Sequence, residues 1–263
     1  MENEVENISI LRLTEGDRRN IKDTVAREFP LTIILNNQEL ITLLCSPKDL
    51  KYLAIGFLFS EGLLSSRDEI NKITVDGRRG IVRVENEGNG ELTKDVLFKR
   101  FITSGCGRGA SFYSAADTKN LTKVESRTQI STHEVLSLVN NFQHRSQIYR
   151  ITGGVHSAAL CDRENILVFS EDIGRHNAID KIFGECIAEN ISTAGRIIIT
   201  SGRISSEILL KVAKRNIPII VSKSAPTDLG IKLADDLGMT LLGFVRGKRI
   251  NAYTSDWRIH DGK

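Results

Sequence analysis

The stretch that decides the fold is RIIITSGRISSEILLKVAKRNIPIIVSKSAP, residues 196–226. It holds two short apolar runs, 196–200 and 217–221, separated by a segment whose apolar residues recur at helical spacing. Continuous apolar runs bounded by polar turns are typical of strands buried on both faces. Strands that alternate with helices predict a layered α/β domain built on a mostly parallel sheet.

The same alternation continues on both sides of this stretch. We predict strands at 166–169 and 239–244 and an edge strand at 251–254, with helices at 175–189, 205–216 and 226–237. A further helix begins after the capping pair Ser131-Thr132 and ends near 143. The sequence therefore predicts a larger three-layer α/β/α domain over 131–263.

The N-terminal third follows another pattern. After a polar leader, alternating residues predict hairpins over 31–44, around Asn36-Asn37, and over 73–84, around Asp76-Gly77. Between them we predict a helix capped by Ser46, with Pro47 at its first position, that stops near Gly62. This indicates a small α+β domain over 1–102, joined by a linker over 103–130.

Composition excludes several broad classes of protein. The chain has 40% hydrophobic residues and a net charge of +3 from 36 basic and 33 acidic side chains, so it can bury a core and is not disordered. That small excess of charge argues against nucleic-acid binding. With no secretory signal at the acidic N-terminus and no apolar stretch long enough for a bilayer, we expect a cytoplasmic protein without membrane partners.

The four cysteines form neither a CxxC pair nor a zinc-like cluster with histidine, so we expect free thiols and no metal. Three of them, Cys45, Cys161 and Cys186, have apolar or helical neighbours and are predicted to be buried. Cys106 lies in the loop Gly105-Cys106-Gly107-Arg108, where glycines leave it accessible and the arginine favours thiolate. We predict a reactive thiol there.

Three polar turns follow predicted strands and open predicted helices: 170–176, 201–203 and 222–227. Ends of parallel strands share one sheet edge, and helix N-termini attract anions, so we expect a phosphate-bearing ligand there. For each turn taken alone, ordinary helix capping is the alternative. The residues predicted to contact the ligand are Arg175, Ser201, Gly202, Arg203 and Ser224. The last four come from a region, 196–250, with ten basic and four acidic residues.

Two histidines and one basic segment add to this prediction. His156 and His176 follow glycine turns at expected helix starts, where they would face the ligand, carry protons, or act only as polar caps. Residues 244–249 leave the last long strand as Phe244, Val245, Arg246, Gly247, Lys248 and Arg249. They are either a basic hairpin tip or donors to a diphosphate.

Five segments in order, GGVHSAAL (153–160), EDIGRHNAIDK (171–181), SGR (201–203), SAPT (224–227) and GFVRG (243–247), resemble the FdhD family. The resemblance extends from 31 to 254 and includes the helix within 47–64. Members of this family are sulfur carrier or sulfurtransferase proteins needed to make active formate dehydrogenase. The resemblance implies a larger domain with a cytidine-deaminase-like fold that lacks the deaminase zinc. Ser157 and Ala158 follow His156 in place of the zinc-binding H-x-E pattern.

The resemblance also implies a sulfurtransferase activity. Cys106 would take persulfide sulfur from a cysteine desulfurase and pass it to Mo-bis(molybdopterin guanine dinucleotide), or its tungsten counterpart, before insertion into the formate dehydrogenase apoenzyme. The family's cofactor-binding segment falls on 244–249, and a guanine nucleotide such as GDP would mimic the cofactor. The cofactor has two chemically alike guanine arms, which would suit a homodimer with two equal sites.

One departure from the family pattern leaves alternatives open. Gly109 stands where most members have the second cysteine of a Cys-x-x-Cys loop, so a mechanism that needs two loop thiols is in doubt. A cofactor-binding chaperone without covalent sulfur transfer is therefore the second hypothesis. A nucleotide-processing enzyme that uses the same sheet edge is the third.

Overall fold

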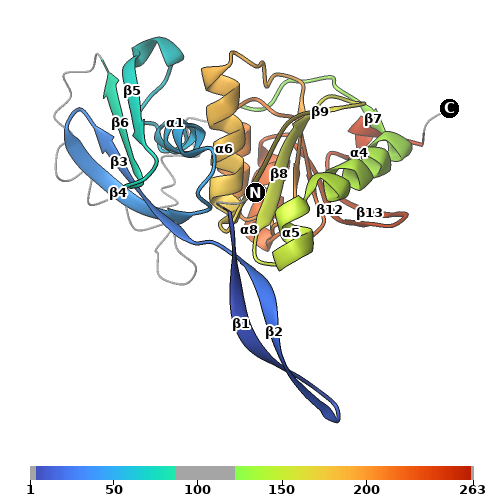
Figure 1. The fold of residues 1–263 in the computed structure, drawn as a ribbon. Helices are drawn as coiled ribbons and strands as arrows, with labels where there is room; N and C mark the ends of the chain where they lie inside the picture. The colour runs from blue at the N-terminus through green and yellow to red at the C-terminus, as the bar shows by residue number, and fades with distance from the viewer. Residues whose placement is uncertain (1–3, 87–121, 262–263) are drawn as a thin grey trace.

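The structure is a computed structural model that describes residues 4–86 and 122–261 (Figure 1). The first described part contains an extended hairpin, a four-stranded sheet, one α-helix and a short 3-10 helix, η1. Their bounds are β1 (Val5–Thr14), β2 (Asp17–Ala26), β3 (Phe29–Leu35), β4 (Gln38–Cys45), α1 (Leu50–Ser60), η1 (Arg67–Glu69), β5 (Ile70–Asp76) and β6 (Ile81–Asn86).

The hairpin of β1 and β2 replaces the predicted polar leader and points away from the rest of the molecule (Figure 1). Most of its residues are exposed or half-buried, so its sequence lacks the alternation that marks a strand with one buried face. The four-stranded sheet has the order β4-β3-β6-β5. It confirms both predicted hairpins, and Asn36 and Asn37 take positive φ angles of 47° and 64° at the first turn.

The start predicted for the first helix is wrong. The helix α1 begins at Leu50, and its N-cap is Asp49, which has a left-handed φ of 54°. Ser46 does not cap it, because its hydroxyl accepts a hydrogen bond from the backbone N–H of Ile173, far along the chain. The predicted end is confirmed, since α1 stops at Ser60 and Gly62 follows with a φ of 72°.

The second described part forms the larger sheet. Its elements are β7 (Ile130–Ser131), α4 (Thr132–Arg145), α5 (Gln147–Thr152), β8 (His156–Cys161), β9 (Ile166–Asp172), α6 (Arg175–Ala188), β10 (Ile197–Thr200), α7 (Ser206–Ala213), β11 (Ile219–Ser222), α8 (Asp228–Asp236), β12 (Thr240–Arg246), β13 (Arg249–Thr254), η2 (Asp256–Arg258) and β14 (Ile259–His260). Six of the strands have the order β13-β12-β11-β10-β8-β9. Pairing makes β9, β10, β11 and β12 run in one direction, so their carboxyl ends lie at one edge.

Helices cover both faces of this sheet, which confirms the predicted three-layer α/β/α arrangement. On one face α6, α7 and α8 pack against alternate strand residues, among them Ala158 and Leu160. On the other face α4 packs against Ala159 and Cys161. Ser131 and Glu134 form a capping box at the start of α4, as the sequence predicts.

The segment that begins at His156 is a strand, so the helix start expected there is wrong. Residues 156–161 form β8, which pairs with β9 on one side and β10 on the other. Gly153, with a φ of 65°, ends the preceding helix α5 instead of opening a new one. His176, by contrast, lies in the first turn of α6, as predicted.

The helices α1 and α6 join the smaller sheet to the larger one and lie side by side in Figure 1. A Cβ atom on Gly56 of α1 would overlap the carbonyl of Asp180, and one on Gly184 of α6 would overlap that of Tyr52. The two helices therefore touch backbone to backbone, which only glycine permits. The predicted linker, 103–130, lies largely outside the described residues, and its described part, 122–130, contains no helix or strand before Ile130, where β7 begins.

Candidate anion-binding site

A cleft of about 880 Å³ opens at the sheet edge where β9, β10, β11 and β12 end. Five of the predicted ligand-binding residues line it: His156, Ser201, Ser224, Arg246 and Gly247. These residues come from positions 156–247 and meet because the ends of the parallel strands and the start of the antiparallel strand β8 lie at the same edge.

Hydrogen bonds hold the turns that form this wall. The Ser201 hydroxyl accepts from the backbone N–H of Ser157 at 3.0 Å and lies 3.4 Å from His156 Nδ1. The Ser222 hydroxyl accepts from the backbone N–H of Ser224 at 2.9 Å and donates to Gly202 O at 2.6 Å. The turns after β10 and β11 are therefore bonded to each other before any ligand arrives.

Four cationic side chains lie in or near the cleft, and the described residues supply no ion-pair partner for any of them. The Nε of Arg246 donates to the carbonyl of Lys223 at 2.9 Å, and both residues line the cleft. Burial, followed by the charge of Arg246, lowers the pKa of Lys223. The cations in question are Lys223, Arg246, Arg175 and Arg203, and none of them forms an ion pair with another described residue. Repelling cations left unpaired favour an anionic ligand.

Arg175 and Arg203 lie close enough to His156, a residue of the cleft wall, to affect its pKa. Burial lowers the pKa of His156, and these two guanidinium groups lower it further. Arg175 packs its side chain against Gly202, and its buried Nε has no hydrogen-bond partner among the described residues. A buried donor without an acceptor is costly, and an anion would supply the acceptor.

Other predicted ligand residues lie outside the cleft wall: Arg175, His176, Gly202, Arg203, Phe244, Val245, Lys248 and Arg249. The side chain of Val245 belongs to the core beneath the sheet, so it offers only its backbone. Arg249 lies over the ring of Phe244, and Lys248 is exposed in the hairpin turn. The start of α8 is capped by its own Thr227, which is the ordinary alternative for that turn.

His176 is not suited to carry protons near neutral pH. Burial, then the charges of Lys211, Arg175 and His156, lowers its pKa to about 3. The carboxylate of Glu207 lies 3.4 Å from His176 Nε2, but the burial and the surrounding cations outweigh it. The ring is therefore neutral at pH 7, and its buried Nε2 makes no hydrogen bond among the described residues although the Glu207 carboxylate lies nearby.

One wall of the cleft is made of residues that the sequence did not predict to bind a ligand. Gln143, His144, Tyr149 and Arg150 line it from α4 and α5. Glu171, at the end of β9, accepts hydrogen bonds from the backbone N–H groups of Ile148 and Tyr149 at 3.1 Å each and so holds α5 in place. The signal in the sequence is weak, because a six-residue helix carries no clear periodicity.

The three cysteines that the structure describes are buried, as predicted. Burial is the main cause that raises the pKa of Cys45, Cys161 and Cys186 to about 12 each. Cys106, the predicted reactive thiol, lies outside the described residues. Within 4–86 and 122–261, we find no cluster of three metal-ligating side chains and no helix long and apolar enough to cross a membrane.

Known proteins resemble this chain over nearly its whole length. Residues 26–260 match the model of the FdhD/NarQ family. A protein named sulfur carrier protein FdhD from Bacillus pumilus (strain SAFR-032) is 45% identical over 245 residues, which are 93% of this chain and 94% of that protein. Another of the same name, from Bacillus subtilis (strain 168), is 43% identical over 252 residues, 96% of each chain.

A solved structure is also similar. It is the crystal structure of a protein proposed to be a formate dehydrogenase accessory protein, from Desulfotalea psychrophila. The two folds superpose with a TM-score of 0.81 at 27% identity, over 97% of this chain and 99% of that one. Because the family match and these similarities span nearly the whole chain, the protein belongs to the FdhD/NarQ family.

Proposed function

We propose that this protein is a sulfur carrier that acts on the molybdenum cofactor of formate dehydrogenase. In this proposal a cysteine desulfurase supplies the sulfur, Cys106 carries it, and Mo-bis(molybdopterin guanine dinucleotide) receives it as substrate before entering the formate dehydrogenase apoenzyme. The names of the relatives, sulfur carrier protein FdhD and formate dehydrogenase accessory protein, support this role.

The observation that carries the proposal is the set of unpaired cations around the cleft. Lys223 and Arg246 line it, and Arg175 keeps a buried Nε–H that has no acceptor within the described part of the chain. Guanidinium and ammonium groups around a hollow of about 880 Å³ suit the diphosphate of a guanine dinucleotide arm. The residues present therefore fit the substrate, and GDP is the simplest probe of the site.

Loading of sulfur onto Cys106 needs one accessible thiolate and no net redox change. The Cys106 thiolate would attack the terminal sulfur of the desulfurase persulfide, and the desulfurase cysteine would leave as a thiolate when its S–S bond breaks. Burial and a pKa of about 12 remove Cys45, Cys161 and Cys186 from the candidates, because they stay protonated at neutral pH. In the sequence, Arg108 supplies the charge that favours the Cys106 thiolate.

Mass spectrometry tests the sulfur step. After incubation with desulfurase and cysteine, the wild type should gain one sulfur atom on the peptide that contains Cys106, and a Cys106→Ser variant should gain none. Absence of sulfur on Cys106 would exclude the relay. Gly109, in place of a second loop cysteine, favours the alternative of a cofactor chaperone without covalent transfer. A Cys106→Ala variant that still fully activates formate dehydrogenase would select that alternative.

Nucleotide binding and oligomeric state test the rest of the proposal. The purified protein should bind GDP without hydrolysing it, which isothermal titration calorimetry and chromatography of the nucleotide would measure. Turnover of GDP would instead indicate a nucleotide-processing enzyme. We further propose a homodimer that presents two equal sites to the two guanine arms, and sedimentation that shows only monomer would contradict it.

A further inference from the structure

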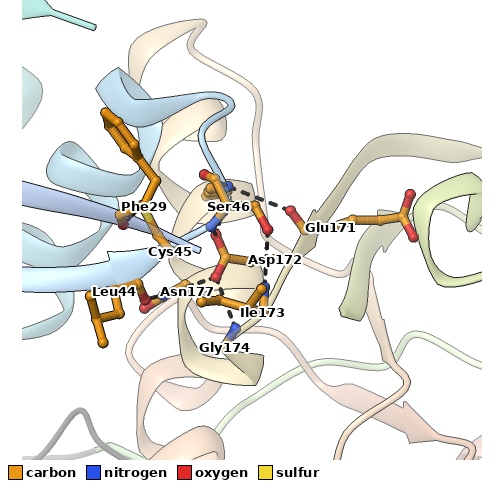
Figure 2. A network of polar contacts seen from close by, with 10 residues as sticks. Phe29, Leu44, Cys45, Ser46, Glu171, Asp172, Ile173, Gly174 and Asn177 are labelled. Carbon is orange, nitrogen blue, oxygen red and sulfur yellow. Dashed lines mark hydrogen bonds and ion pairs between the residues drawn. The ribbon is translucent and has the colours of Figure 1, made fainter. Parts of the chain in front are cut away.

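A buried cluster of polar side chains surrounds Asp172, next to the turn that contributes Ile173 to the cleft (Figure 2). Asp172 is fully buried at the end of β9, accepts three hydrogen bonds and forms one ion pair. Its Oδ1 accepts from Gly174 N and Asn177 Nδ2, each at 2.9 Å. Its Oδ2 accepts from Ser46 N at 3.0 Å and pairs with Lys181 Nζ at 2.7 Å. The carboxylate is thus held from both sides.

Ser46 completes the cluster. It belongs to the part of the chain that contains the four-stranded sheet and α1, residues 29–86, which we call the smaller sheet unit. It lies between β4 and α1 with 3% of its surface exposed. Its hydroxyl accepts from the backbone N–H of Ile173 at 3.1 Å, and its carbonyl accepts from Lys181 Nζ at 3.2 Å. The N–H groups of Ile173 and Gly174 are therefore bound by Ser46 and Asp172, and Figure 2 shows these contacts converging from different ribbons.

The turn held in this way is part of the cleft. Ile173 lines it directly. Arg175, two residues later, packs on Gly202 and is close enough to His156 for its charge to lower the pKa of that ring. A shift of the 173–174 turn would therefore move one wall of the cleft and one of its cations together.

The neighbouring carboxylate serves the opposite wall. Successive residues of a strand point to opposite faces, and in Figure 2 the Glu171 side chain extends away from the Asp172 cluster. Glu171 holds α5, whereas Asp172 holds the start of α6 and the smaller sheet unit. Through Ser46, the Asp172 side connects the cleft to the segment that leads into α1.

We propose that Ser46 and Asp172 are positioning residues that set the affinity of the cleft for its ligand. Through them, the β4–α1 segment of the smaller sheet unit fixes the 173–175 turn in the geometry that binds a guanine nucleotide diphosphate. Neither residue lines the cleft, so each acts through the turn that it holds. This inference rests on the proposed function, since it presumes that the cleft binds such a ligand.

The test is GDP binding by calorimetry to the full chain and to matched variants. Ser46→Ala removes the acceptor of the Ile173 N–H and should weaken binding about five- to tenfold. Asp172→Asn replaces two acceptor oxygens by one and should weaken it more. Ile173 should also exchange its amide hydrogen faster in Ser46→Ala, a local change that hydrogen exchange detects.

Ser60 and Asp180 provide matched controls. The Ser60 hydroxyl donates to Asp180 Oδ1 at 2.6 Å, and Asp180 pairs with Lys211 at 2.6 Å, so this pair also joins α1 to α6. Neither residue lines the cleft or bonds to the 173–175 turn. Ser60→Ala and Asp180→Asn should lower the melting temperature but keep the wild-type affinity for GDP.

The outcomes are distinct. Wild-type affinity in Ser46→Ala and Asp172→Asn, or equal weakening in Ser60→Ala, would overturn the inference alone. Failure of the wild type to bind GDP would overturn the proposed function and this inference with it. If Asp172→Asn does not fold, Ser46→Ala decides the matter, because it removes only one hydroxyl.

Discussion

Asp172 Oδ2 lies 2.7 Å from Lys181 Nζ, and the two side chains have exposed fractions of 0% and 1%. The pair joins the end of β9 to the middle of α6, and both residues also bond to Ser46. Two charges so far from water are tolerated only when each has the other and its remaining hydrogen bonds are made. The site behind the cleft is therefore rigid, and it is sensitive to the loss of either partner.

Replacing the lysine of this pair should be strongly destabilising. Lys181→Met leaves the buried Asp172 carboxylate without its counter-charge, and we expect a loss of about 3 kcal/mol in the free energy of unfolding. Urea denaturation monitored by circular dichroism measures it. The double variant Asp172→Asn/Lys181→Met should lose less than the two single variants added together. Strict additivity would contradict a coupled pair.

The backbone contact between α1 and α6 predicts a reversal of normal helix energetics. Alanine usually stabilises an exposed helix by about 1 kcal/mol relative to glycine. Gly184→Ala should instead destabilise by about 3 kcal/mol or more, because its Cβ would overlap the Tyr52 carbonyl. Thermal denaturation measures this effect. Gly77→Ala is the control: Gly77 has open space around its Cβ position, so its melting temperature should stay near that of the wild type.

Charge removal in the cleft should weaken nucleotide binding. Arg246→Gln removes an unpaired guanidinium from the cleft wall and should raise the Kd for GDP about tenfold, the effect of one charge-assisted contact. Calorimetry at low and moderate salt should also show a smaller salt dependence for this variant. Lys232→Gln removes an exposed cation of α8 outside the cleft and should bind GDP like the wild type. Equal weakening by both would point to a diffuse charge effect.

The low pKa of His176 predicts a loss of stability in mild acid. Unfolding raises this pKa from about 3 to its ordinary value of 6.5, so below pH 6.5 the unfolded chain binds a proton that the folded one does not. Its contribution to stability is present above pH 6.5 and falls by about 2 kcal/mol between pH 7 and pH 5. His176→Gln should lose that much less over the same range in urea titrations. An unchanged pH slope would show that the ring already carries a proton in the folded protein.

Thiol labelling should separate the cysteines. With their pKa values raised to about 12, Cys45, Cys161 and Cys186 are protonated and enclosed at pH 8, so iodoacetamide should leave them unmodified in the native protein. Peptide mass spectrometry identifies the labelled positions. In guanidinium chloride at a concentration that unfolds the protein, the same reagent should label all three cysteines, which is the control for their intrinsic reactivity. Rapid native labelling of any of them would contradict the burial described above.

Much of the fold follows from local patterns. The apolar runs at 196–200 and 217–221, the Asn36-Asn37 turn and the Ser131 capping box depend on interactions among residues close together in the chain, and all of them were predicted correctly. The shared edge of the sheet also follows from the sequence, because alternation of strand and helix implies parallel strands. That inference brought Ser201 and Ser224 together in advance, whereas His156 was expected at a helix start and Arg246 in a separate basic segment.

Other features depend on tertiary contacts. Ser46 has the local signature of a helix cap, yet it bonds to Asp172, 126 positions away. His156 follows a glycine turn that resembles a helix start, but the strand pairings on both sides make it the first residue of β8. A local sequence signal reflects only interactions between residues that are close in the chain. A buried hydrogen bond to a distant residue can outweigh those interactions.

The sequence alone determined the α/β class, the family resemblance and the edge at which cations meet, because periodicity and motif order are properties of the chain itself. Only the tertiary structure decided that Val245 points into the core, that α5 supplies a wall of the cleft, and that Gly56 and Gly184 bring α1 against α6. These depend on which side chains become buried together, and burial is settled by packing between segments that are distant in the sequence.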